Sequence, residues 1–329
     1  MTQSIAKEDS RMTGKRDLLT LEEFNPAEFK SLLDLADRFK LERKERIFGH
    51  QVPGTSLALI FEKPSTRTRV SFEVAMFELG GHAVVLSSRD MQLSRGETLE
   101  DTARTLSQFC HAICARVNSH DTLVSFSRSA DVPVINALSD RYHPCQSVAD
   151  IQAIRETKKN LTGLKIAWIG DGNNVCNSLL IGAALTGMNV SVSCPSKFVP
   201  LQEALSKAHE ISKLTGSVLE VIESPKDAVK GADVVMTDTF VSMGDEEEKK
   251  ERLEVFLPNY QVNRELFSKA KADAVFMHCL PAHRGEEVTS EIIDGPRSIV
   301  WKETEDRLHA QKSILYTLLN KYAIEPDSS

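Results

Sequence analysis

Short β-forming runs alternate with segments of helical periodicity along nearly the whole chain, and this alternation limits the fold more than any other feature. The runs are SLALIF, HAVVL, AICAR, VPVIN, KIAWIG, NVSVSC, DVVMTD, AVFMHC and SIVW. The helical segments between them include 27–46, 98–110, 144–158, 175–187, 200–214 and 246–256. Strands that alternate with helices in this way predict parallel sheets with helices on both faces. The predicted fold class is therefore α/β.

The nine runs fall into a group of four and a group of five, which predicts two sheets. A chain of 329 residues is also long enough for two domains. The stretch CQSVADIQAIRETKKNLTG between the groups is long enough for a helix that joins two lobes. We expect two doubly wound domains, 1–148 and 149–305, each with a mainly parallel sheet flanked by helices, joined by interdomain helices. The last segment, 306–329, contains a helical stretch that could pack on either lobe.

The composition excludes several classes of protein. With 41% hydrophobic and 26% charged residues, the chain is typical of a soluble globular protein. A net charge of −7 and a pI near 5.8 argue against nucleic acid or a membrane as partner. No stretch approaches the roughly 20 apolar residues that span a bilayer. The first residues lack the apolar core of a secretory signal, so we expect a cytoplasmic location. Six cysteines without a C-x-x-C pair predict neither a disulfide framework nor a zinc ribbon.

Polar side chains follow the predicted strands at the point where each strand ends. Arg116 ends one run, His143 and Gln146 follow the next, and Asp238 and Cys279 end two later runs. Ligands of open α/β sheets bind beyond the carboxyl ends of the strands. The sequence therefore predicts a cleft at this end of the sheets.

The stretch IFEKPSTRTRVSFE at 60–73 has the pattern of a strand, a turn and a helix start. The turn carries Ser65, Thr66, Arg67, Thr68 and Arg69, with no carboxylate among them. Backbone N–H groups at a helix start favour anions, and the added hydroxyls and guanidinium groups supply further donors. An ordinary capped helix would need a Ser or Thr but not the whole cluster. The stretch thus favours a site for phosphate or carboxylate.

The turn GDGNN at 170–174 has the Gly-x-Gly of a dinucleotide-binding fingerprint. The position of the third glycine holds Val175, and the next strand ends in SVSCPSK without an acidic residue for a ribose. A nicotinamide cofactor is therefore disfavoured. Asn173 and Asn174 are better suited to hydrogen bonds with a small polar substrate.

Two histidine-containing stretches allow structural as well as functional interpretations. His143, in HPCQ, taken alone is as typical of a structural histidine as of a functional one. HCLPAHR at 278–284 suits a cysteine nucleophile beside a base, or a zinc site made by His278, Cys279 and His283. Neighbouring strand residues point to opposite faces, so His278 and Cys279 share a metal only if the strand has already ended. No other metal-ligand spacing is present and we expect no metal, whereas a thiol that contacts substrate stays possible.

The charged run after DTFVSMG places glutamates before lysines in one helical segment, which suits the helix dipole. We interpret this run as a solvated helix face. The loop before it, 242–244, could be a mobile lid.

Five motifs in order resemble the aspartate/ornithine carbamoyltransferase family. STRTR at 65–69 and HPCQ resemble its carbamoyl-phosphate half, and DGNN, DTFVSMG and HCLP resemble its ornithine-specific members. The similarity covers nearly the whole chain, from about residue 17 to about residue 320. Members specific for aspartate or acetylated ornithine lack the Ser-Met-Gly loop, so this loop carries much of the substrate expectation.

The resemblance implies a homotrimer with active sites shared between subunits, and no cofactor. It implies that 1–148 binds carbamoyl phosphate, that 149–305 binds ornithine, and that 306–329 returns as a helix to the first domain. The residues matched to carbamoyl phosphate are Ser65, Thr66, Arg67, Thr68, Arg116, His143, Gln146, Cys279, Leu280 and Arg307, with Gln92 lent by the neighbouring subunit. The residues matched to ornithine are Asn174, Asp238, Ser242 and Met243. The sequence AHRGEEV after Cys-Leu-Pro departs from the pattern, and no role is transferred to His283 or Arg284.

The implied activity is transfer of the carbamoyl group of carbamoyl phosphate to the side-chain amine of L-ornithine, giving L-citrulline and phosphate in arginine metabolism. The catalytic residues implied are Arg67, Arg116, His143, Asp238 and Cys279. Putrescine or an acylated ornithine is the alternative acceptor. A dinucleotide-dependent oxidoreductase would leave the Ser-Thr-Arg-Thr cluster without a role, and a catalytically silent homologue would not need every contact residue. We expect carbamoyl phosphate to bind first, after which the lobes approach and loop 242–244 closes over ornithine.

Overall fold

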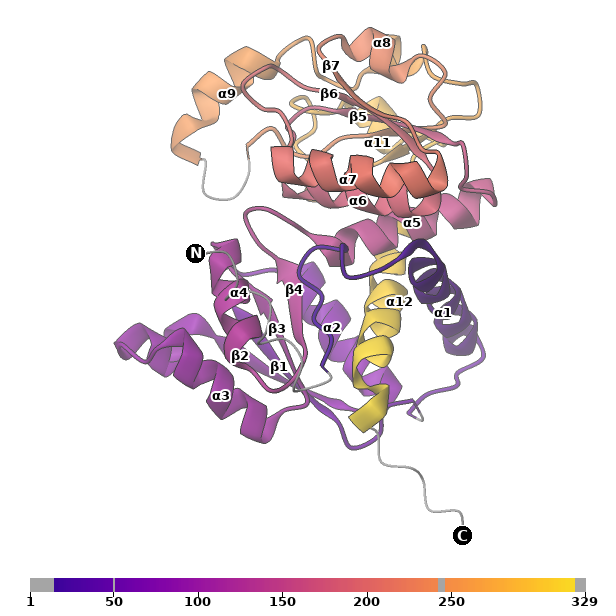
Figure 1. Ribbon diagram of the computed structural model, residues 1–329. Coiled ribbons are helices and arrows are strands. Elements are labelled where there is room, and N and C mark those ends of the chain that lie inside the picture. The colour runs from indigo at the N-terminus through magenta and orange to yellow at the C-terminus, as the bar shows by residue number, and fades with distance from the viewer. Residues whose placement is uncertain (1–14, 50, 242–245, 323–329) are drawn as a thin grey trace, which may run out of the picture.

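The computed structural model describes residues 15–49, 51–241 and 246–322 and arranges them around two sheets (Figure 1). The sheet orders are β2-β1-β3-β4 and β7-β6-β5-β8-β9, with parallel pairing throughout. The strands are β1 (Ser56–Phe61), β2 (His82–Ser87), β3 (Ala112–Arg116), β4 (Val134–Leu138), β5 (Lys165–Ile169), β6 (Asn189–Ser193), β7 (Leu219–Ile222), β8 (Val234–Met236) and β9 (Val275–Met277). The predicted α/β class, with four strands in one sheet and five in the other, is confirmed.

Helices connect the strands and cover both sheets. The α-helices are α1 (Pro26–Lys44), α2 (Thr66–Leu79), α3 (Leu99–Phe109), α4 (His120–Ser129), α5 (Pro144–Lys158), α6 (Asn174–Thr186), α7 (Gln202–Thr215), α8 (Pro225–Val229), α9 (Lys249–Phe256), α10 (Arg264–Phe267), α11 (Ser290–Ile293) and α12 (Val300–Leu319). Four short 3-10 helices are η1 (Ser88–Asp90), η2 (Gln92–Arg95), η3 (Glu246–Glu248) and η4 (Asn320–Tyr322). Within the described ranges, no helix combines the length and apolar character that crossing a bilayer requires.

One predicted strand is wrong. The run SIVW is not the fifth strand of the second sheet, because Ser298 makes only an isolated bridge to Phe276 and Val300 already begins α12. The fifth strand is β7, which pairs with β6 at the sheet edge. A short apolar run does not distinguish a strand from the buried start of a helix. Strand β7 was not predicted, because it is a short edge strand in which Glu220 and Val221 are exposed, so its sequence lacks a clear apolar run.

Local capping explains where three helices begin. Asn25 and Glu28 form a reciprocal capping box at the start of α1, with backbone–side-chain distances of 2.9 and 3.0 Å. Ser65 caps α2 by accepting a hydrogen bond from Thr68 N at 3.3 Å. Asn173 caps α6, because its Oδ1 accepts hydrogen bonds from the Val175 and Cys176 backbone N–H groups. The two polar turns of the sequence are thus helix starts.

Both sheets reverse their strand order beside the strands that carry these turns. In the first sheet the order changes direction between β1 and β3, and in the second between β5 and β8. Such switch points open a crevice beyond the carboxyl ends of the strands, which is where ligands of open α/β sheets bind. The turns after β1 and β5, and the residues that follow β3 and β8, therefore have the positions of a ligand site.

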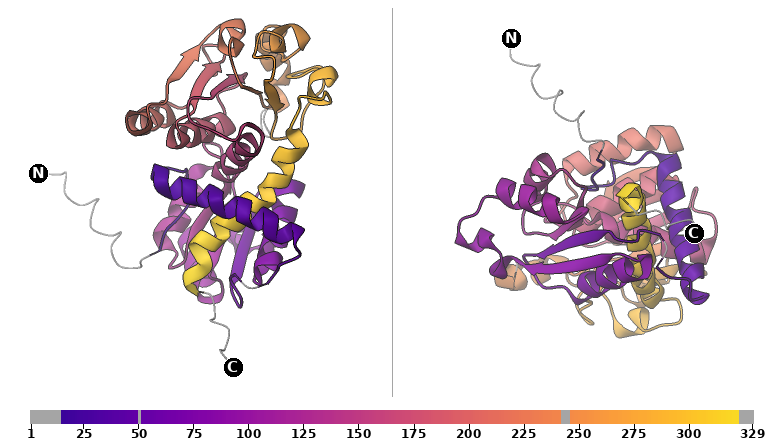
Figure 2. Two further views of the ribbon diagram at one scale, coloured as in Figure 1. Left: turned by 90° about the vertical axis from the view of Figure 1, so that its right-hand side faces the viewer. Right: turned by 90° about the horizontal axis from the view of Figure 1, so that it is seen from below.

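Two long helices connect the domains. Helix α5 is buried from Pro144 to Ile154, and α12 packs against α5, α1 and α2. In the left view of Figure 2, α12 (yellow) runs from the second domain across the first, beside α1 (indigo). Because α12 begins at Val300, its first turns lie beside the turn after β9, where Glu303 accepts a hydrogen bond from the His278 backbone N–H.

Candidate active site

A pocket of about 800 Å³ lies between the two domains, at the carboxyl ends of β1, β3, β4, β5, β8 and β9. It brings together most of the residues that the sequence predicts for a site. These are Ser65, Thr66, Arg67, Thr68, Arg116, His143, Gln146, Asn174, Asp238, Cys279, Leu280 and Arg307. Gln92 does not line it, since it is exposed in η2. Ser242 and Met243 lie outside the described residues.

One wall of the pocket is rich in guanidinium groups. Arg67 comes from the first turn of α2, Arg116 ends β3, and Arg307 is in α12. No carboxylate of the described residues forms an ion pair with any of the three. Arg307 instead donates to Gln146 Oε1 and, at 3.4 Å, to Thr68 Oγ1. Within the same described ranges, the buried Nε atoms of Arg116 and Arg307 have no partner, so this wall has donors available for an anion.

Electrostatics distinguish the groups of this wall. Burial, and then the charges of Arg307 and Arg67, lower the pKa of Arg116 to about 10. Burial also lowers the pKa of His143 well below its usual value, and Arg307, Arg116 and Arg67 lower it further. His143 is therefore neutral at physiological pH and can donate one hydrogen bond from its ring. Its backbone N–H is held by Ser178 Oγ at 2.8 Å, which places the ring at the start of α5.

The opposite wall is built around the carboxylate of Asp238, which follows β8. Asn173 Nδ2 donates to Asp238 Oδ2 at 2.8 Å, and the Thr239 backbone N–H donates to Oδ1 at 2.8 Å. Cys279 Sγ donates to the same Oδ1 at 3.2 Å. Asn174 reaches across to the first domain, where its Nδ2 donates to Ser139 O at 2.6 Å. This wall therefore offers a negative charge and amide groups, which suits an amine or an amino acid.

The Cys279 thiol is protonated. Desolvation by the surrounding protein, and then the charge of Asp238, raise the pKa of Cys279 well above its usual value. Because the reactive form of cysteine is the thiolate, the structure does not favour the nucleophile that HCLPAHR allowed. The thiol instead acts as a hydrogen-bond donor to Asp238.

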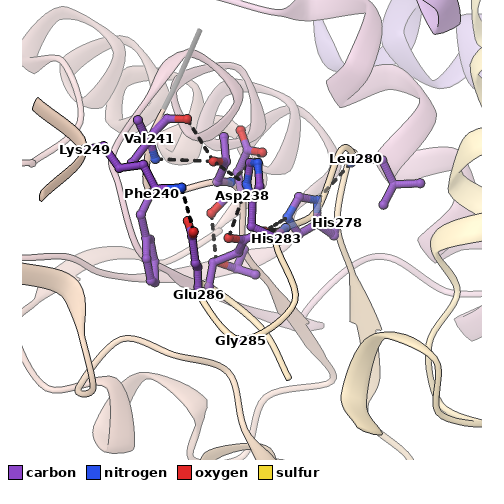
Figure 3. A network of polar contacts seen from close by, with 12 residues as sticks. Asp238, Phe240, Val241, Lys249, His278, Leu280, His283, Gly285 and Glu286 are labelled. Carbon is purple, nitrogen blue, oxygen red and sulfur yellow. Dashed lines mark hydrogen bonds and ion pairs between the residues drawn. The ribbon is translucent and has the colours of Figure 1, made fainter. Parts of the chain in front are cut away.

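A metal site is also disfavoured at this turn. Strand β9 ends at Met277, and ligand atoms of Asp238, His278 and Cys279 lie within 4.8 Å of one another. Both ring nitrogens of His278 are nevertheless occupied. Nδ1 accepts from the Leu280 backbone N–H at 2.9 Å, and Nε2 bonds Glu287 Oε1 at 3.0 Å (Figure 3). The histidine thus holds the turn and has no lone pair directed to a metal.

Some pocket residues were not predicted. Asn118 and Asp140 follow β3 and β4 and could have been found by the same strand-end rule. Lys249, in the charged run that was predicted to be a solvated face, also lines the pocket. Its Nζ pairs with Glu286 Oε1 at 2.8 Å, a contact visible in Figure 3. The Lys249 side chain is 49% exposed, so the charged run is solvated as predicted, and the turn of 281–287 places Glu286 beside the start of α9.

The glycines of GDGNN have a packing role. A Cβ on Gly172 would lie 2.3 Å from the backbone nitrogen of Pro200. Gly170 has φ +126°, a conformation that side chains rarely adopt. Packing of this turn against the segment after β6 is therefore enough to explain Gly172, and no bound nucleotide is needed to explain it.

Comparisons with known proteins cover the chain almost completely. Residues 16–156 match the family model for the aspartate/ornithine carbamoyltransferase carbamoyl-P binding domain, and residues 162–318 match the Asp/Orn binding domain. The ornithine carbamoyltransferases of Methanosarcina acetivorans and Methanosarcina mazei are 50% and 51% identical over 305 residues, which is 93% of this chain and 99% of each relative. The solved ornithine carbamoyltransferase of Pyrococcus furiosus is 48% identical with a TM-score of 0.89, over 93% of this chain and 97% of its own. With its two domains in the same order and half of its residues identical over nearly its full length, the chain belongs to the aspartate/ornithine carbamoyltransferase family.

Proposed function

We propose that this protein transfers the carbamoyl group of carbamoyl phosphate to the side-chain amine of L-ornithine, giving L-citrulline and phosphate. The observation that carries the proposal is one pocket with a guanidinium-rich wall facing a carboxylate wall. The first suits a phosphate and the second suits an amine. The relatives of about half identity are named ornithine carbamoyltransferases, which supports the same assignment.

Carbamoyl phosphate is assigned to the guanidinium-rich wall. Planar guanidinium groups match phosphate oxygens in pairs, and the first N–H groups of α2 add donors and a favourable dipole. The proposed contacts are Ser65, Thr66, Arg67, Thr68, Arg116, His143, Gln146, Cys279, Leu280 and Arg307, with Gln92 from a neighbouring subunit. Arg67, Arg116 and Arg307 form no ion pair with a carboxylate of the described residues. A bound dianion would neutralise their positive charge, so binding relieves the repulsion among the three guanidinium groups.

Ornithine is assigned to the carboxylate wall, with Asn174, Asp238, Ser242 and Met243 as contacts. Asp238 is held in place by three donors, so it can orient an amine without moving. A carboxylate beside an ammonium raises the pKa of that ammonium, which favours binding but opposes the loss of a proton that attack requires. The nearby arginines act in the opposite direction. Asp238 and Cys279 are therefore assigned to positioning the amine, and neither is assigned as a general base.

The reaction joins the two walls. The uncharged amine nitrogen attacks the carbonyl carbon, the bond from that carbon to the phosphate oxygen breaks, and phosphate leaves and can take the amine proton. Orientation of two bound reactants can account for about 7–11 kcal/mol of barrier reduction. Arg67, Arg116 and neutral His143 supply donors where negative charge grows on the carbonyl oxygen and the leaving phosphate.

The proposal includes the organisation of the molecule. Residues 1–148 form the carbamoyl-phosphate domain, 149–305 the ornithine domain, and 306–329 the part that returns to the first domain. Exposed apolar side chains on α2 and β2, namely Val70, Phe77 and Val84, support burial against other subunits of a homotrimer. A cytoplasmic location and a step in arginine metabolism complete the proposal.

Closure over the bound substrates is a further part of it. The placement of the motifs in both domains motivates it, and loop 242–244, the proposed lid, lies outside the described residues. Amide hydrogen exchange over 246–256 should slow when both substrates are bound. Equal exchange with and without them would contradict closure.

The experiment that tests the function is citrulline formation by the purified protein from carbamoyl phosphate and L-ornithine. Putrescine and acetylated ornithine serve as matched acceptors that lack the α-carboxylate or the free α-amine. Rapid turnover with ornithine and little with the others is expected. Faster turnover with putrescine would replace ornithine by a diamine, and no carbamoylated product from any acceptor would remove the proposal.

A further inference from the structure

Two buried carboxyl groups lie behind the pocket, one on each of the helices that connect the domains. Asp150 is in α5 and Glu303 is in α12, and their exposed fractions are 0% and 1%. Neither lines the pocket. Among the described residues, neither forms an ion pair. Two carboxyl groups so deeply buried need an explanation, because an unpaired buried charge is costly.

Their hydrogen bonds connect three parts of the site. Gln146 Nε2 donates to Asp150 Oδ1 at 2.7 Å and to Glu303 Oε1 at 3.3 Å. The backbone N–H of His278 donates to Glu303 Oε2 at 3.0 Å. Helix α5, helix α12 and the turn that carries Cys279 therefore meet at these two carboxyl groups.

The same contacts orient the Gln146 amide. Its Nε2 points to the two carboxyl groups, so its Oε1 is left to accept from Arg307 Nη1. Arg307 in turn donates to Thr68 Oγ1. A continuous path of hydrogen bonds thus runs from Asp150 and Glu303 to the guanidinium-rich wall.

The contacts of Asp150 and Glu303 favour one proton on the pair. Both carboxyl oxygens of Glu303 accept hydrogen bonds from N–H groups. The buried Asp150 Oδ2 accepts no hydrogen bond from an N–H or hydroxyl group of the described residues. Burial raises the pKa of Asp150 to about 7, although its hydrogen bonds with Gln146 and Glu303 lower it. Burial also raises the pKa of Glu303 well above its usual value, and the charge of Asp150 and the hydrogen bond with it raise this pKa further. Arg307 is the cation that faces them, from α12, and it lowers the pKa of Asp150. The Cys279 thiol, also close, is neutral.

We propose that Asp150 and Glu303 are positioning residues, which hold Gln146 and the Cys279 turn in place for carbamoyl transfer as one carboxylic acid hydrogen-bonded to one carboxylate. The proton is shared between the two side chains, which form a hydrogen bond with each other. A second ionisation would place two like charges side by side without water and would push the two connecting helices apart. This inference rests on the proposed function, since the roles of Gln146 and Cys279 come from it.

Two substitutions of similar size at position 150 test the pair. Asp150→Asn keeps an acceptor for Gln146 and a donor for Glu303, so it imitates the protonated acid. Asp150→Leu removes both. We expect kcat and KM of Asp150→Asn to stay within about threefold of the unsubstituted protein, whereas Asp150→Leu raises KM for carbamoyl phosphate about tenfold or more, because Gln146 loses its anchor.

Stability against pH gives a readout that does not depend on activity. A carboxyl group whose folded pKa is raised binds more protons in the folded state, so its contribution to stability falls as pH rises from the unfolded value near 4 toward the folded value. Asp150→Asn cannot lose this proton. Its melting temperature, relative to the unsubstituted protein, should be higher at pH 8.5 than at pH 5.5 by about 2 °C or more.

The outcomes separate the pair from the function. If the melting-temperature difference is the same at both pH values, the shared proton is absent and the inference is overturned. If Asp150→Leu melts lower but keeps the KM of the unsubstituted protein, the pair is merely structural and the positioning role is overturned. Absence of citrulline formation by the unsubstituted protein refutes the proposed function instead, and the pH dependence of melting still decides whether the proton is shared.

Discussion

Arg67 and Arg69 lie two positions apart in α2, yet only Arg67 lines the pocket. The Arg69 side chain is 57% exposed and pairs with Glu73 of its own helix at 3.6 Å. Residues two apart in a helix point to different sides, so the helix itself separates the two guanidinium groups. Of the five polar residues at 65–69, the first four line the pocket and Arg69 does not.

This difference gives a matched pair of substitutions. Arg67→Gln should lower kcat/KM for carbamoyl phosphate about a hundredfold or more, because it removes a charged donor to the phosphate and the carbonyl oxygen. Arg69→Gln should leave kcat/KM nearly unchanged, since it removes only an exposed ion pair. Steady-state kinetics on both folded variants check the prediction. Full activity of Arg67→Gln would contradict the assignment of the anion wall.

Asp238 belongs to the other wall, and its substitution should separate the two substrates. Asp238→Asn keeps the size of the side chain but removes the charge that attracts the amine. We expect turnover to collapse and carbamoyl-phosphate affinity to stay nearly the same. Calorimetric titration with carbamoyl phosphate, beside a turnover assay, measures both quantities. Weakened carbamoyl-phosphate binding would refute the division into two walls.

At the scale of elements, the turn between β5 and α6 depends on close backbone packing. Gly172→Ala places a Cβ 2.3 Å from Pro200 N, and the atom it meets is backbone, which cannot move aside easily. We expect the free energy of unfolding to fall by about 1–3 kcal/mol, the usual cost of overpacking. Urea denaturation followed by circular dichroism measures it. An unchanged midpoint would mean that the segment after β6 moves freely, contrary to the packing argument.

The helices that connect the domains show why some site residues escape sequence analysis. Arg307 is found by resemblance, since its neighbourhood in α12 has the pattern of a family motif. Asp150 and Glu303 are 153 positions apart in the chain, and each alone has the appearance of an ordinary helical acid. Only the crossing of α5 and α12 brings them together with the Gln146 amide.

For the whole molecule, the proposed trimer makes a prediction about Gln92, which is exposed and away from the pocket of its own chain. Light scattering should give three times the chain mass of 36.6 kDa. Gln92→Ala and Arg67→Gln should each be nearly inactive alone. Trimers reassembled from a mixture of the two should regain activity, because some sites then combine an intact Arg67 from one subunit with an intact Gln92 from another.

The control for reassembly is a mixture of Arg67→Gln with Asp238→Asn. Arg67 and Asp238 line the pocket of the same chain, so exchange of subunits cannot rebuild a complete site from these two variants. A glutamine shared between subunits would be contradicted if both mixtures regained the same activity, or if neither mixture regained any.

The sequence by itself determined the α/β class, the two sheets and most of the pocket, because β-strand and helix periods and the residues at strand ends are local properties. It assigned the fifth strand of the second sheet wrongly, since an apolar run such as SIVW has the same local pattern in a strand and in a buried helix start. Tertiary structure alone decided that Lys249 meets Glu286, that the His278 ring holds the turn after β9, and that Asp150 and Glu303 lie together. The Lys249–Glu286 contact joins segments 37 positions apart in the chain, and the carboxyl pair joins α5 to α12. The role of the His278 ring depends on the path of the turn after β9, where Leu280 and Glu287 reach its two nitrogens. Neither strand nor helix periodicity records such contacts.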